Sequence, residues 1–114
     1  MEREFIRTKQ FDNNWKDMGL TEEHLLILER NLCINPLAGK VIQGTGGLRK
    51  IRWSYNDKGK KGGMRVFYVD FVVFEKIYLI SVFPKNVKTD LSAEEAKQLE
   101  KMIKILEKEL KGGK

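Results

Sequence analysis

The chain has 114 residues, of which 41% are hydrophobic and 33% are charged, and its formal net charge is +6. This length corresponds to one domain, and this composition is typical of a globular protein and excludes an intrinsically disordered one. The single cysteine, Cys33, excludes an internal disulfide and a zinc site built from several cysteines.

The first third of the chain predicts a short strand followed by two helices. Residues 2–7 alternate weakly between charged and apolar side chains, as in a strand. Apolar residues at helical spacing predict a helix over 8–18 and a second one over 22–34. Thr21 is a favourable N-cap for the second helix, and Pro36 ends it, because the residue before a proline is pushed out of the helical region. We expect these two helices to form an antiparallel hairpin.

The central part of the chain is rich in valine, isoleucine and aromatic residues, which favours strands. The glycines at 44–47 match no nucleotide-binding spacing, and a strand follows them where such motifs have a helix, so they predict a turn. A polar, glycine-bearing segment at 56–63 predicts a loop. We expect strands at 41–42, 48–53, 64–73 and 77–83.

The last part of the chain predicts one long helix. Ser92 and Glu95 form a capping box, and an apolar stripe runs from Leu99 to Leu110. The fold class is therefore α+β, with helices packed on one face of a small, mostly antiparallel sheet. The longest apolar stretch, 66–74, is interrupted by Asp70 and is about half of the roughly 20 residues that a membrane helix needs. Together with the unpaired cysteine and the absence of a signal peptide, this predicts a cytoplasmic protein and no membrane partner.

The positive charge is concentrated in the centre of the sequence. Residues 40–89 contain 11 basic and 3 acidic side chains, whereas the two flanking parts are slightly acidic or neutral. In the strand at 48–53, the period of two places Lys50 and Arg52 on one face. Arg65 lies near the start of the next long strand, and Lys85 follows the last strand. If these strands are neighbours, four cations converge on one surface suited to phosphates, although a merely solvated sheet face is the alternative.

Five aromatic residues are interleaved with this charge, and they offer stacking surfaces for unpaired RNA bases. These aromatic residues are Trp53, Tyr55, Phe67, Tyr68 and Tyr78. A core position is the favoured interpretation for Trp53 and Phe67, whereas Tyr55 and Tyr68 fit either role.

The chain offers few alternatives to this basic cluster. His24 is the only histidine, and its place in the first turn of the second helix indicates a surface or helix-end role. With one histidine and one cysteine, no transition-metal site and no Ser-His-Asp set is expected.

Four segments together resemble one family. They read GTGGLRKIRW at 44–53, GKKGGMRVFYV at 59–69, IYLISVFPKN at 77–86 and DLS at 90–92. In combination they are similar to the RelE/HigB-type toxins of bacterial type II toxin–antitoxin systems, with the HigB branch closest. The resemblance covers essentially the whole chain.

The resemblance implies a compact RelE-like fold and a ribosome-dependent mRNA endonuclease. Such toxins enter the ribosomal A site, where the 2′-hydroxyl of the mRNA attacks the adjacent phosphate and leaves a 2′,3′-cyclic phosphate. They need no metal or other cofactor. A cognate antitoxin, here expected to be a helix-turn-helix protein, neutralises the toxin, and operator DNA is bound only through the complex.

The resemblance also assigns roles to individual residues. Arg65 matches the arginine that grips the scissile phosphate, and Lys50, Arg52 and Lys85 match the basic residues around it. Asn86 stands where RelE-like members can carry a second arginine, and no tyrosine follows Tyr78 where such members can carry a catalytic one. Further residues expected to hold ribosomal or messenger RNA are Arg49, Lys58, Lys60, Lys61, Tyr68, Asn86 and Lys88.

Two other functions remain open at this level. One is a toxin of the same fold that acts without cleaving RNA, like the ParE-like toxins that inhibit DNA gyrase. This function predicts DNA damage with intact mRNA. A non-catalytic RNA-binding module predicts salt-sensitive RNA affinity without toxicity.

Overall fold

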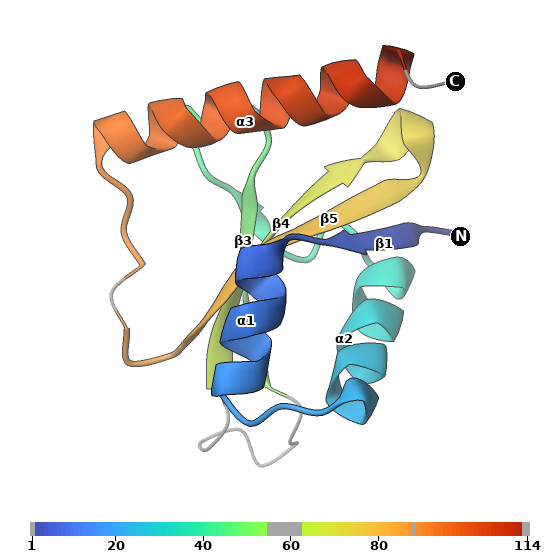
Figure 1. Cartoon of the computed structure of the whole chain (residues 1–114), viewed down its shortest axis with the longest axis vertical. Coiled ribbons are helices and arrows are strands. Elements are labelled where there is room, and N and C mark those ends of the chain that lie inside the picture. Colours follow the sequence, from blue (N-terminus) through green and yellow to red (C-terminus); the bar gives the residue numbers. More distant parts are fainter. Residues whose placement is uncertain (1, 55–62, 88, 113–114) are drawn as a thin grey trace.

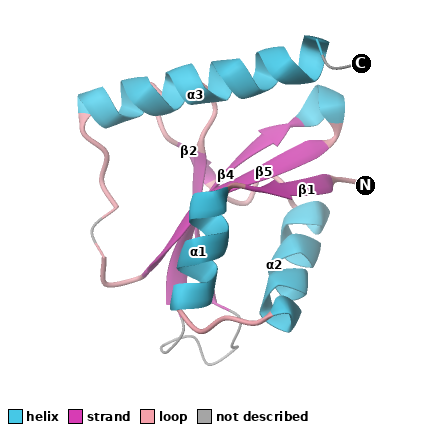
Figure 2. Cartoon of the chain, in the orientation of Figure 1, coloured by secondary structure: helices cyan, strands magenta, loops and turns pink. Residues whose placement is uncertain are grey.

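A five-stranded sheet forms the centre of the molecule (Figures 1 and 2). The computed structural model describes residues 2–54, 63–87 and 89–112. The strand order is β1-β5-β4-β3-β2; β1 runs parallel to β5, and the other neighbours are antiparallel. The strands are β1 (Glu4–Arg7), β2 (Lys40–Val41), β3 (Arg49–Ser54), β4 (Gly63–Phe71) and β5 (Lys76–Pro84).

Three helices cover the sheet on both faces. The hairpin of α1 (Lys9–Asp17) and α2 (Glu22–Ile34) lies on one face, and α3 (Ala93–Gly112) crosses the other, as Figure 1 shows. The expectation that all helices pack on one face is therefore wrong. The reason lies in β4 and β5, which are apolar on both faces, so that each face needs its own cover.

Two apolar clusters, one on each face, hold these layers together. The first cluster joins Phe11, Trp15 and Leu28 of the helical hairpin to the sheet through Trp53 and Val66, among others. The second cluster packs Ile103 and the partly buried stripe of α3 against the opposite face; its sheet residues include Leu48, Phe67, Val69, Phe71 and Ile80. The core positions expected for Trp53 and Phe67 are thus confirmed.

The boundaries of α2 agree with the sequence prediction, because the signals that set them are local. The Thr21 side chain accepts a hydrogen bond from the His24 backbone N–H, and His24 Nδ1 accepts one from the Thr21 N–H. His24 is therefore a helix-capping residue, as its position indicated. Asn35, before Pro36, has left the helical conformation, with φ −139° and ψ 81°.

The hairpin between β4 and β5 differs from the expectation. The strand expected at 64–73 ends at Phe71, and Val72–Phe74 form a single 3₁₀ turn. Glu75 then takes a left-handed conformation with φ 53°, which reverses the chain into β5. Because residues 71–74 are all apolar, the sequence gives no sign of this turn.

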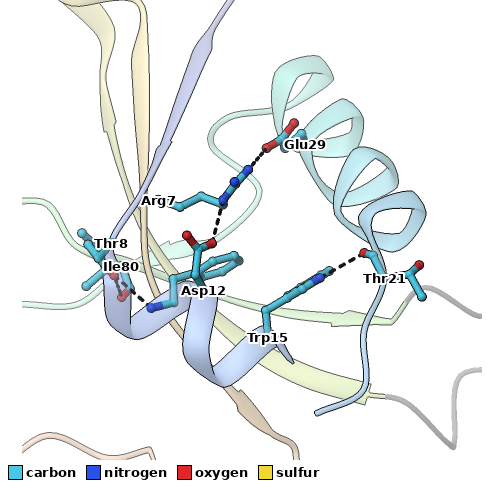
Figure 3. Close-up of polar contacts among 8 residues, drawn as sticks. Arg7, Thr8, Asp12, Trp15, Thr21, Glu29 and Ile80 are labelled. Carbon is cyan, nitrogen blue, oxygen red and sulfur yellow. Dashed lines mark hydrogen bonds and ion pairs between the residues drawn. The ribbon is translucent and has the colours of Figure 1, made fainter. Parts of the chain in front are cut away.

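The chain around α1 is anchored by side chains that bond backbone groups (Figure 3). The Thr8 hydroxyl accepts from the Phe11 N–H and donates to the Ile80 carbonyl oxygen at 2.6 Å. Ile80 lies where the register between β4 and β5 shifts by one residue, so this bond satisfies a carbonyl at an irregular point of the ladder. At the other end of α1, Trp15 Nε1 donates to the Thr21 carbonyl oxygen at 3.0 Å.

A buried ion pair fixes the N-terminal strand. Arg3, just before β1, reaches across β5 to Asp70 of β4, with Nε 2.8 Å from Oδ1 and side chains only 5% and 2% exposed.

Within the described ranges, no helix combines the length and the apolar character needed to cross a membrane.

Candidate nucleic-acid interface

The basic side chains of β2, β3 and β4 form a row on one face of the sheet. In the antiparallel ladders, Arg52 is paired with Arg65, and Lys50 is paired with Lys40 on its other side. Directly opposite residues of an antiparallel pair project from the same face with Cβ atoms about 4.5–5.5 Å apart. We call these four residues, Lys40, Lys50, Arg52 and Arg65, the cation row.

The sequence places these cations on one face because apolar residues occupy the other. Between Lys50 and Arg52, Ile51 packs against the cluster under the helical hairpin, and Trp53 is part of that cluster. Met64 and Val66, on either side of Arg65, also belong to the cluster under the helical hairpin. The expected alternation of Lys50 and Arg52 with Ile51 and Trp53 is therefore confirmed, and β3 and β4 are neighbours, which is the condition for these cations to converge.

The cation row lies in an open hollow of about 650 Å³. All four cations line it. Figure 1 shows that α3 crosses the sheet near the β4–β5 hairpin. The other end of these two strands, where β4 begins and β5 ends, lies away from α3. The lining residues are Ala38, Lys40, Val41, Ile42, Lys50, Ile51, Arg52 and Arg65.

Carboxylates do not neutralise this row within the part of the chain that the structure describes. The ion pairs there lie elsewhere: Arg3–Asp70, Arg7–Asp12, Arg7–Glu29, Lys76–Glu4 and Lys104–Glu100. Two like-charged cross-strand pairs in one hollow repel each other and destabilise the sheet. A polyanion placed in the hollow removes this repulsion, because each phosphate meets cations that are already fixed by the strands.

The segment after β5 lies beside the row. The Lys85 backbone N–H donates to the Gly63 carbonyl oxygen at 3.1 Å, which brings Lys85 next to the start of β4. Lys85 and the following Asn86 are exposed, but neither lines the hollow. Lys50 Nζ lies 3.5 Å from Thr89 Oγ1, so the chain leading to α3 borders the hollow on this side.

The expectation that Tyr68 contacts RNA is wrong. Its side chain is fully buried, at 0% exposure, in the cluster under the helical hairpin. Its hydroxyl donates to the Pro36 carbonyl oxygen at 2.7 Å and accepts from the Gly39 N–H at 2.8 Å. Burial raises the pKa of this hydroxyl above its ordinary value. No base can stack on a ring in this position.

Arg49 also lies apart from the cation row. It is paired with Tyr68 and therefore projects from the opposite face to Lys50. Its Nη1 donates to the Gly39 carbonyl oxygen at 2.6 Å, which gives this guanidinium a structural contact. Four other residues expected to contact RNA lie outside the described residues, namely Lys58, Lys60, Lys61 and Lys88. Tyr55 lies outside them as well.

Lys40 is the member of the row that sequence reasoning did not single out. Its strand, β2, has only two residues, too few to show a period. The signal that identifies it is the pairing with β3, which appears only in the structure.

The other motifs make no second site. The glycines at 44–47 form a turn in which Gly44, Gly46 and Gly47 have positive φ, and Thr45 closes it by donating to the Ile42 carbonyl oxygen. Among the described residues, no group of three or more His, Cys, Asp or Glu side chains is placed to hold a metal ion.

A comparison of the chain with models of known protein families finds no match.

Proposed function

We propose that this chain is the toxin component of a bacterial type II toxin–antitoxin system, with a RelE-like fold closest to the HigB branch, and that it cleaves mRNA on the ribosome. Two features support the proposal. One is the resemblance of four sequence segments to that family. The other, which carries the argument, is the Arg52–Arg65 pair in an open hollow with two lysines beside it.

The reaction is a transesterification at phosphorus. The 2′-oxygen of a ribose forms a bond to the adjacent phosphorus as it loses its proton, and the bond from phosphorus to the 5′-oxygen of the next nucleotide breaks. The 5′-oxygen takes up a proton, and a 2′,3′-cyclic phosphate remains. Negative charge grows on the phosphorane oxygens in the transition state, so fixed cations stabilise it more than the ground state.

Arg65 is the main clamp in this proposal. Its planar guanidinium matches two phosphate oxygens at once, and its backbone is paired on both sides, with Arg52 of β3 and Phe83 of β5. Arg52 faces the same phosphate from the neighbouring strand. Lys50 and Lys85 add positive potential from the two sides.

The partners follow from this activity. The substrate is mRNA held in the A site of the ribosome, in the cytoplasm. The cognate antitoxin, which we expect to be a helix-turn-helix protein encoded by a short neighbouring reading frame, covers or distorts the basic hollow. Operator DNA is contacted through the complex with that antitoxin.

The experiment that tests the proposal incubates the purified chain with ribosomes programmed with a defined mRNA, and with the same mRNA free in solution. We expect cleavage on the ribosome only, with 2′,3′-cyclic phosphate ends. Intact mRNA in both reactions would contradict the proposal. DNA gyrase inhibition would then support the ParE-like alternative, and salt-sensitive RNA binding without growth arrest would support a simple binding module.

A further inference from the structure

The wall of the hollow that carries Lys40 is held by three hydrogen bonds to one short segment, 36–40. Tyr68 Oη bonds both the Pro36 carbonyl oxygen and the Gly39 N–H. Arg49 Nη1 donates to the Gly39 carbonyl oxygen. Both polar groups of the Gly39 backbone are therefore bonded to side chains that come from the sheet.

Gly39 itself packs against β3 with no room for a side chain. A Cβ at this position would lie 2.9 Å from Tyr68 Cε1 and 3.1 Å from the backbone carbon and oxygen of Lys50. Real Cβ atoms essentially never come within 3.0 Å of another group, and 3.1 Å is tighter than nine in ten of their contacts, so a side chain here would force the Tyr68 ring or β3 to shift. This close approach brings the next residue, Lys40, into register with Lys50.

The result is an exposed ammonium held beside like charges. Lys40 is exposed, shares a face with Lys50, and lines the same hollow as Arg52 and Arg65. Like charges directly opposite each other in a ladder are destabilising. A buried tyrosine and a buried glycine nevertheless fix the segment that carries this lysine, and a bound polyanion explains the arrangement.

We propose that Lys40 is a further RNA-backbone-binding residue and that Tyr68 is the positioning residue that holds it. This inference rests on the proposed function and extends it. At about 4.8 Å between neighbouring strands and about 3.4 Å per residue along a strand, Lys40 lies roughly 12 Å from Arg65, which is two strands away and two residues further along the ladder. Lys40 therefore meets a phosphate next to the scissile one, and it contributes to binding rather than to the chemical step.

The test measures binding and cleavage separately. Binding uses a single-stranded RNA oligonucleotide with 2′-O-methyl groups, which has no attacking hydroxyl, over a series of KCl concentrations. We expect Lys40→Ala to reduce the slope of log K against log salt by about 0.7, the value of one phosphate contact on a single strand. Lys40→Arg is expected to restore the slope. Lys16→Ala, at an exposed lysine of α1 on the other face, is the matched control.

In cleavage on programmed ribosomes, Lys40→Ala is expected to raise KM with little change in kcat, because its contact is made equally in the ground and transition states. Tyr68→Phe is expected to weaken RNA binding in the wild-type background and to have no further effect in Lys40→Ala. Such non-additivity separates positioning of Lys40 from general destabilisation.

The outcomes separate this inference from the proposed function. Absence of cleavage by the wild type, together with a slope that depends on Lys40, would support the inference and contradict the proposed nuclease. Normal cleavage by the wild type, with Lys40→Ala indistinguishable from Lys16→Ala in slope and KM, would overturn the inference alone.

Discussion

Arg52 lies directly opposite Arg65 in the ladder between β3 and β4, so two guanidinium groups project from the same face of the sheet. An ordinary sheet face pairs opposite charges at such positions, because like charges there are destabilising. Among the described residues, neither arginine forms an ion pair with a carboxylate. Removing one of these arginines is therefore expected to lower activity, and at Arg52 also to raise the stability of the fold. The first two predictions depend on this pair.

Arg65→Ala is expected to lower kcat for mRNA cleavage by about 100- to 1000-fold, the usual effect of removing one donor that stabilises a transition-state oxyanion. Growth arrest is expected to disappear while the chain still folds. The measurement is single-turnover cleavage on programmed ribosomes. Arg30→Ala, at an exposed arginine of α2, removes the same charge from the other face and should retain full activity. Full toxicity of Arg65→Ala would contradict the assignment of the clamp.

Arg52→Gln is expected to increase the free energy of unfolding by about 0.2–1 kcal/mol, because it removes one charge of a repelling cross-strand pair. The same substitution is expected to reduce cleavage. Urea denaturation of the wild type and the variant measures the first effect. A variant less stable than the wild type by more than that range would show that Arg52 has a structural role.

Asp70→Asn is expected to destabilise the fold by about 3–5 kcal/mol, because it leaves the buried Arg3 guanidinium without its counter-charge. Thermal and urea unfolding measure this loss. Replacing both partners, as in Arg3→Met with Asp70→Leu, is expected to recover most of the stability, since a buried ion pair exchanged for apolar packing is often neutral. Wild-type stability in Asp70→Asn would contradict the importance of this pair.

Tyr68→Phe is expected to reduce stability at neutral pH by about 1–3 kcal/mol, because the bonded groups of Pro36 and Gly39 lose their buried partner. The comparison is Tyr78→Phe, at a half-buried tyrosine on the other face of the sheet. An equal effect of the two substitutions would contradict the role given to the Tyr68 hydroxyl.

The pH dependence of stability provides a second test of Tyr68. Burial raises its pKa in the folded state above the ordinary value of 10.0. Above that value the unfolded chain loses the phenolic proton while the folded chain retains it, so the contribution of Tyr68 to stability falls as the pH rises through its folded-state pKa. The wild type is therefore expected to lose stability above pH 10 more steeply than Tyr68→Phe. Parallel curves would contradict this.

Local signals predicted the helices well. The cap at Thr21 and the stop at Pro36 define α2, and the Ser92–Glu95 capping box defines the start of α3, where each residue bonds the backbone of the other. The two faces of β3 were also predictable from Lys50 to Trp53, where cations and apolar residues alternate.

Long-range features were not predictable from the sequence. The run of Phe67, Tyr68 and Val69 is apolar throughout, so no period indicates that Tyr68 faces the helical hairpin while its two neighbours face α3. For the same reason the need for helices on both faces was missed. The parallel pairing of β1 with β5 and the pairing that brings Lys40 to Lys50 join residues whose partners only the folded chain identifies.

The proposed cleavage of mRNA by this chain is tested most directly by mapping the 5′ ends of mRNA in bacteria that express the chain, with translation running and with ribosomes kept off the message. We predict new ends inside codons that appear only during translation and that vanish when Arg65→Ala replaces the wild type, while Arg30→Ala retains them. Growth arrest by the wild type with intact mRNA, or the same cuts in Arg65→Ala, would contradict the account.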